Sequence, residues 1–272
     1  MATDVQQLWD HSRPDLSEGR FRAALATAEP TEALILKTQI ARTYGIRKDF
    51  ESARQILAEV ERDMGQATGE PQVRYWLELG RTYSSATHTP ESQTDDARAQ
   101  ARDAFGRAFS LAKTERLDYL AIDALHMMAF VDTEPTDQLK WDLEALAYME
   151  GSQQAEAKKW EGSLRNNVGY ALYLQKRYNE ALQEFERSRE ARERDGSERG
   201  VRIAKWMMAS TYRAMEHYPK ALEIQLELEH EWQDAGEVDP YVFEELEALY
   251  RVMGDHARAE HYASMLVASR GT

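Results

Sequence analysis

Residues 167–185, with the sequence NVGYALYLQKRYNEALQEF, decide the fold of this chain. Small and large apolar side chains recur in this stretch at spacings of three and four, which is the period of one face of a helix. Lys176 and Arg177 interrupt the series, and a second series begins at Tyr178 and continues through Ala181. The stretch therefore predicts two antiparallel helices that are joined by a tight turn and pack closely through their small residues.

Both halves of this pattern recur along the chain. An aromatic residue followed three residues later by alanine occurs at Phe21, Phe50, Tyr178 and Tyr218, with His256 beginning a weakened copy. A second pattern, a small residue followed three residues later by an aromatic, lies upstream of the first. It occurs in Ala41 with Tyr44, Gly80 with Tyr83 and Ala209 with Tyr212. The alanines at 181, 221 and 259 are 40 and 38 residues apart. A fixed period of this length predicts stacked helix pairs, because one pair cannot bury its apolar stripe alone.

The composition agrees with an all-helical protein and excludes several classes. Only 14 glycines and 7 prolines occur in 272 residues, and no segment alternates Val, Ile or Thr with polar residues as a strand would. The net charge of −14 argues against a nucleic-acid-binding protein, which needs clustered Lys and Arg. No secretory leader or membrane-spanning run is recognisable, so we expect a cytoplasmic protein. The absence of cysteine excludes disulfides, thiolate metal sites and cysteine nucleophiles.

The repeated pattern resembles the tetratricopeptide repeat. The best match runs from Asn167 through Gly169, Tyr178 and Ala181 to Phe185. The resemblance implies an all-α fold, a right-handed superhelical α-solenoid of stacked antiparallel helix pairs that forms a single domain over residues 1–272. Its period of about 40 exceeds the family's usual 34 or so. The fourth unit is degenerate because it lacks the Gly and Ala markers, and residues 84–95 form an inserted polar loop. The seven expected units lie near 4–29, 31–65, 70–113, 116–151, 153–196, 198–236 and 238–270.

In this family the first helices of the units line a concave groove that holds a peptide or another protein's helix. The positions two before and one after the small residue, with neighbours one turn away, face the groove. Arginines there could bind carboxylates, and the aromatic residues could supply apolar contacts. The alternative is that the arginines pair with acids on adjacent helices and that Trp206 and Met207 pack in the core. The candidate groove residues are Gln39, Arg42, Arg74, Glu78, Arg81, Asn166, Asn167, Tyr170, Tyr173, Trp206, Met207, Ser210 and Arg213.

No sequence motif indicates catalysis. The seven histidines do not form a His-Glu-x-x-His pattern, and no glycine-rich phosphate loop is present. His126 lies in a methionine-rich apolar run and is expected to pack rather than to bind a ligand. The lysines of the family's chaperone-tail clamp are missing from their positions. We therefore expect no enzyme, no cofactor and no metal site.

Two functions from different classes remain open. The first is a protein–protein interaction scaffold or adaptor that holds a partner peptide or helix. The second is a ligand-responsive regulator that resembles the repeat part of bacterial signalling-peptide receptors. Those receptors carry an effector region before the repeats, whereas the repeats here begin near residue 4, so a separate effector chain would be needed. Self-association through the terminal helices, giving a homo-oligomer, is a third interpretation. The 84–95 loop is a flap over the groove, a modification site or a tolerated surface insertion.

Overall fold

The computed structural model describes residues 4–65, 67 and 69–270. These residues form helices and turns and contain no strand, so the predicted all-α fold of helix pairs is confirmed. The chain divides into two compact units, residues 1–160 and 161–272, and each is described by itself. The single-domain extent and the right-handed superhelix stay predictions. Among the described helices, none combines the length and apolar character that crossing a bilayer requires.

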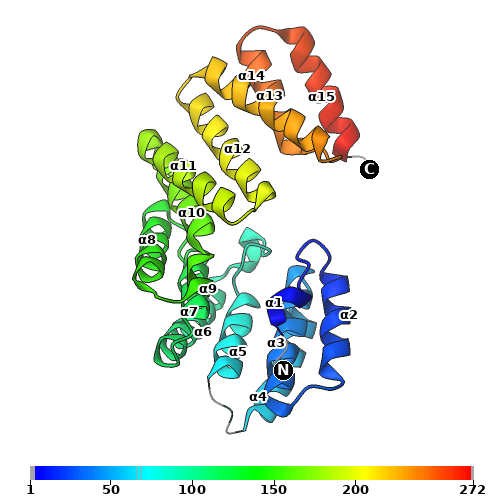
Figure 1. Cartoon of the computed structure of the whole chain (residues 1–272), viewed down its shortest axis with the longest axis vertical. Helices are drawn as coiled ribbons and strands as arrows, with labels where there is room; N and C mark the ends of the chain where they lie inside the picture. Colours follow the sequence, from blue (N-terminus) through cyan, green and yellow to red (C-terminus); the bar gives the residue numbers. More distant parts are fainter. Residues whose placement is uncertain (1–3, 66, 68, 271–272) are drawn as a thin grey trace. The chain divides into compact units, whose positions relative to one another are not determined.

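In the first unit, consecutive helices run back and forth and pack on one another (Figure 1). The first helices of neighbouring pairs also make contact, α3 with α5 and α5 with α7. This arrangement places one face of three helices side by side. The elements are α1 (Val5–Leu8), α2 (Pro14–Leu25), α3 (Pro30–Ile46), α4 (Phe50–Met64), α5 (Glu70–Arg81), the short 3-10 helix η1 (Pro90–Ser92), α6 (Asp95–Thr114), α7 (Asp118–Met128), α8 (Pro135–Gly151) and α9 (Ala155–Lys158).

The second unit repeats the arrangement with three helix pairs among its described residues. Here α12 contacts both α10 and α14, so the first helices again lie next to one another. Pro219 lies in the first turn of α13, as predicted, where its missing N–H has no helical partner to lose. The helices are α10 (Glu161–Leu174), α11 (Tyr178–Arg194), α12 (Glu198–Ala214), α13 (Tyr218–Asp234), α14 (Pro240–Val252) and α15 (His256–Arg270).

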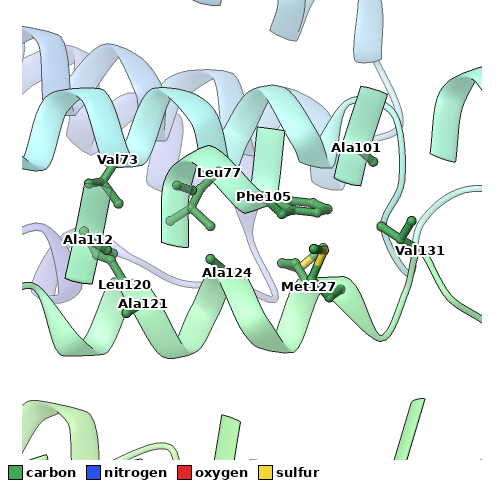
Figure 2. Close-up of a cluster of buried hydrophobic side chains, with 12 residues drawn as sticks. Val73, Leu77, Ala101, Phe105, Ala112, Leu120, Ala121, Ala124, Met127 and Val131 are labelled. Carbon is green, nitrogen blue, oxygen red and sulfur yellow. The ribbon is translucent and has the colours of Figure 1, made fainter. Parts of the chain in front are cut away.

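Small residues on the first helices allow the aromatic rings of the second helices to approach closely. A Cβ atom on Gly80 would lie 2.5 Å from Cε1 of Phe105, and one on Gly169 would lie 2.6 Å from Cε1 of Phe185. Both rings are fully buried. Figure 2 shows Phe105 in a cluster whose side chains come from α5, α6, α7 and the turn that follows α7. The glycines of the repeat pattern are therefore sites of close packing.

Seven helices in the described part of the chain end with a residue of positive φ and a pair of backbone hydrogen bonds that close the last turn. Glu216, after α12, has a φ of 61°, and Gly236, after α13, has a φ of 72°. Lys176, in one of the predicted turns, has a φ of 60°. A side chain makes this left-handed conformation unfavourable, whereas glycine adopts it freely.

The two turns that flank α13 give a matched pair of substitutions. Glu216→Gly is expected to raise the free energy of unfolding by about 0.5–1 kcal/mol, because it relieves the left-handed backbone. Gly236→Ala is expected to lower it by about 1 kcal/mol, although a Cβ there would meet no atom within 4 Å. Urea unfolding followed by circular dichroism measures both shifts. Changes of the same sign in the two variants would contradict this interpretation.

Candidate ligand-binding pocket

A pocket of about 230 Å³ lies in the first unit, between α3, α5 and α7. Its volume is below the roughly 300–1,000 Å³ that is usual for drug-sized ligands, so it suits a group the size of one residue. Apolar walls surround a small set of charged and polar side chains. The lining residues are Ala41, Arg42, Gly45, Ile46, Glu78, Arg81, Thr82, Ser85, Ala86, Thr87, Asp123, His126, Met127, Phe130 and Trp160.

A buried ion-pair network forms one wall of the pocket. Arg81 donates from Nη1 to Glu78 Oε1 at 2.6 Å and from Nη2 to Asp123 Oδ1 at 2.5 Å. Burial alone would raise the pKa of Asp123, but the charges of Arg81 and Arg42 hold it below its ordinary value. Burial opposes the charged form of Arg81 as well, yet Asp123 and Glu78 raise its pKa. Arg81 and Asp123 are therefore ionised, and Arg81 is hydrogen-bonded to both acids.

Arg42 differs from Arg81 because none of its donors is used by a residue that the structure describes. Its side chain is 28% exposed, and its nearest carboxylate oxygen is Glu78 Oε1, 3.7 Å from Nη1. It donates no hydrogen bond to any residue that the structure describes. The guanidinium carbon lies 5.6 Å from the centre of the Trp9 ring, a cation–π contact. Burial and the repulsion of Arg81 lower the pKa of Arg42, but a guanidinium stays charged at neutral pH.

His126 lies beside the network and packs against aromatic rings, as expected from the sequence. Its ring centre is 5.3 Å from that of Phe130 and 5.3 Å from that of Trp160. Burial lowers the pKa of His126 to about 4, against the smaller opposing effect of Asp123. The imidazole is therefore neutral at pH 7, and it lines the pocket without adding charge.

The lowered pKa of His126 predicts a loss of stability in acid. The unfolded chain binds this proton near pH 6.5 and the folded chain only near pH 4, so the stabilisation present at pH 7 declines through this window. At pH 4.5 the loss is expected to be about 2 kcal/mol. Urea unfolding at pH 7 and pH 4.5 measures it, and His126→Phe, which retains a ring but cannot titrate, should show a correspondingly smaller difference. An equal pH dependence in both proteins would contradict the assignment.

The loop after α5 forms part of the pocket wall. Ser84 is buried and donates to the backbone oxygen of Phe130 at 2.9 Å, and Thr87 donates to that of Gly45 at 3.4 Å. The His88 ring stacks on Phe50 with the centres 4.0 Å apart. These contacts join residues 84–88 to α3, α4 and the turn after α7. Residues 85–87 thereby border the pocket.

The structure brings together three of the five candidate residues that belong to this unit. Arg42, Glu78 and Arg81 line the pocket. Gln39 is buried and accepts a 3.0 Å hydrogen bond from Trp9 Nε1. Arg74 is also buried and donates to Glu70 Oε1 at 2.6 Å. Gln39 and Arg74 therefore support neighbouring side chains and do not line the pocket.

The other candidates lie in the second unit, in two groups. On α10, Asn166 and Asn167 are half-buried, and Tyr170, 46% exposed, stacks with Tyr173 at 6.4 Å. On α12, the half-buried Trp206 lies 6.3 Å from the ring of Tyr241. A hollow of about 210 Å³ is lined there by Arg202, Ile203, Trp206, Asp239 and Tyr241.

The remaining candidates on α12 are engaged within the unit. Met207 and Ser210 are buried. Arg213 makes two hydrogen bonds to the carboxylate of Glu245, at 2.7 and 2.8 Å. The sequence analysis considered, as an alternative to ligand binding, that the groove arginines pair with acids. Both Arg213 and Arg81 are paired in this way.

Sequence reasoning missed several residues that line these hollows. Asp123 belongs to the fourth unit, which lacks the small-residue markers, so no repeat position could be assigned to it. Trp160 directly precedes α10 and lies ahead of the offsets that were considered. Tyr241 lies in the first turn of α14, ahead of the offsets that were considered. The only sequence signal for Asp123, which pairs with Arg81, was that it is an acidic residue within an apolar helix.

The fold is a helical-repeat array, and its first unit has a pocket of about 230 Å³ on the first helices. The family description "tetratricopeptide repeat" matches residues 160–228, so this part of the chain consists of tetratricopeptide repeats. No curated protein sequence matches the chain.

Solved structures share this fold at low sequence identity. The apo form of RapI aligns with a TM-score of 0.68 and 13% identity over 95% of this chain and 71% of its own. A signal transduction ATPase with a tetratricopeptide repeat sensor, from Pyrococcus horikoshii, aligns at 0.67 and 12% identity over 94% of this chain. The chain spans only 39% of that ATPase. The apo quorum sensor NprR from B. thuringiensis aligns at 0.52 and 13% identity, over 95% of this chain and 82% of NprR. At these identities the likeness concerns the fold alone.

Proposed function

We propose that the chain is a non-catalytic, cytoplasmic interaction module that holds a peptide or a segment of another protein on its first helices. The observation that supports this best is the first-unit pocket, where Arg42 and Arg81 lie among apolar walls. Repeat arrays of this kind generally act as binding surfaces rather than as enzymes. Peptide recognition commonly combines apolar anchor pockets with a few charge-assisted hydrogen bonds.

The pocket supplies both elements. Met127, Phe130 and Trp160 offer apolar contact area, and Arg42 offers donors that no described residue uses. The hollow at Trp206 and Tyr241 in the second unit is a second apolar surface. Aromatic side chains of this type contribute most to binding at protein interfaces, because they bury a large area at low entropic cost.

Blocking the pocket tests the proposal. Ala86 is an exposed residue of the loop that lines the pocket, so Ala86→Trp fills the cavity without changing the core. Affinity capture from the host cell should lose its partner with this variant. Thr89→Trp, in the same loop but outside the pocket, is the matched control and should retain it.

The second unit is tested in the same way. Replacing Trp206 and Tyr170 together with alanine should weaken capture while helicity stays unchanged. The proposal would be overturned if the same proteins are captured by the wild type, by the double alanine variant of Trp206 and Tyr170, and by Ala86→Trp.

The ligand-responsive regulator is the second candidate. It is favoured by the loop of residues 84–88, which hydrogen-bonds to backbone oxygens near the ends of α3 and α7 while it borders the pocket. A bound ligand would therefore contact several elements at once. A sensor domain and a quorum sensor among the structures of similar fold are consistent with this role. Small-angle scattering distinguishes the candidates, since a smaller radius of gyration with the captured peptide favours the regulator and an unchanged one favours a passive adaptor.

Self-association through the terminal helices remains a separate prediction. On α15, Val267 is 73% exposed, and Met265 and Leu266 are half-buried. Light scattering over a range of protein concentrations would detect a homo-oligomer.

A further inference from the structure

We infer that the first-unit pocket accepts a carboxylate carried next to an apolar side chain, and that Arg42 anchors this carboxylate. The inference rests on the proposed function, since it names the chemistry of the ligand that the same pocket would hold. It follows from the way the charges of the pocket are paired.

The network contains two cations and two acids, but their pairing is unequal. Arg81 bonds to both Glu78 and Asp123, so the two carboxylates share one guanidinium. Arg42 keeps its N–H groups free of any described residue, with its closest acid contact at 3.7 Å. A guanidinium has five donors in a planar fork that matches the two oxygens of a carboxylate. Among the described residues, Arg42 therefore has only a long ion pair with Glu78 and no hydrogen-bonded carboxylate.

Exposure decides which charge an incoming ligand meets. The side chain of Arg42 is 28% exposed, whereas those of Glu78 and Asp123 are 3% and 5% exposed. The acids are thus covered and the cation is accessible. The Trp9 ring lies beside the guanidinium and limits its movement, which lowers the entropic cost of binding. A cationic ligand would meet Arg42 first and be repelled.

The charge of the ligand group follows from the same arrangement. Arg42 has hydrogen-bond donors that no described residue uses, and the carboxylate of Glu78 lies close to it, so a singly charged anion fits better than a phosphate with nearly two charges. The neutral His126 adds no second cation at pH 7. Beside the charged group, Met127, Phe130 and Trp160 provide the apolar wall for an adjacent side chain. The carboxylate can belong to a chain end or to an acidic residue.

Two pairs of small probes test the inference and separate these sources. N-acetylphenylalanine and N-acetylphenylalaninamide differ only in a terminal carboxylate. N-acetylglutamyl-phenylalaninamide and its glutaminyl counterpart differ only in a side-chain carboxylate. Calorimetric titration of the full chain should give at least about tenfold tighter binding of the acid than of the amide in one of the pairs. The pair that discriminates identifies the source of the carboxylate.

Arg42→Gln should abolish this discrimination, because it lowers the binding affinity of the acid probe to that of the amide probe. The matched control is Arg107→Gln. Arg107 lies on α6, outside the pocket, with its guanidinium 4.6 Å from the Trp76 ring centre. The control should preserve the discrimination. Circular dichroism and urea unfolding verify that both variants are folded.

The outcomes separate the inference from the proposed function. Equal binding of acid and amide in both pairs would overturn the carboxylate inference and leave the pocket as a binding site. Discrimination that survives Arg42→Gln would also overturn it. If no probe binds, the carboxylate inference fails, while capture with Ala86→Trp still tests the proposed function independently.

Discussion

Replacing Asp123 with alanine is expected to lower the free energy of unfolding of the first unit by about 3–5 kcal/mol. Asp123 is buried on α7 and accepts a hydrogen bond from Arg81 on α5. Without this carboxylate, Arg81 and Arg42 would share Glu78 alone in a region that water reaches poorly. A buried charge that loses its partner costs far more than the pair gains when it is intact. Urea unfolding followed by tryptophan fluorescence measures the change.

Asp103→Ala is the matched control for this prediction. Asp103 belongs to the same unit, and its carboxylate also pairs with an arginine, Arg107, but its side chain is 59% exposed. An exposed pair within one helix contributes about 0.5 kcal/mol or less. Similar losses in the two variants would show that the pairing of Asp123 is not structurally important.

The Arg81–Asp123 pair also shows where sequence reasoning stops. The repeat pattern predicts Arg81 at a groove-facing position of a first helix, and the structure places it on α5, in the wall of the pocket. The pattern does not identify the partner, which is 42 residues away in a unit that lacks the marker residues. Periodicity fixes the face of a helix on which a side chain lies. It does not fix which side chain on the next helix will be within hydrogen-bonding distance.

The fold was more predictable because its signals are local. The turn at Lys176 and the position of Pro219 follow from the chemistry of helix ends and need no distant contacts. The pocket depends instead on the path of residues 84–88, whose polar sequence allows many conformations. Their position is set by contacts such as Ser84 with the backbone of Phe130, which join residues 46 positions apart. Such contacts are invisible in a single sequence.

Gly80→Ala is expected to destabilise the first unit by about 2 kcal/mol, although alanine normally stabilises a helix relative to glycine by about 1 kcal/mol. The new Cβ would lie 2.5 Å from Cε1 of Phe105, and this ring is fully buried within the cluster shown in Figure 2. Thermal and urea unfolding measure the loss. Gly106→Ala on α6 is the matched control, because a Cβ there meets nothing within 4 Å and should stabilise the protein.

A second substitution tests whether the clash with the ring is the cause. The preceding helix pair of this chain already uses another combination, in which Ala41 and Leu57 occupy the corresponding repeat positions of one buried cluster. Gly80→Ala combined with Phe105→Leu reproduces that combination. The free energy of unfolding of the double variant should exceed the value expected from adding the two single changes. The expected excess is about 1 kcal/mol or more. Simple additivity would show that Gly80 is required for a reason other than the volume of the ring that packs against it.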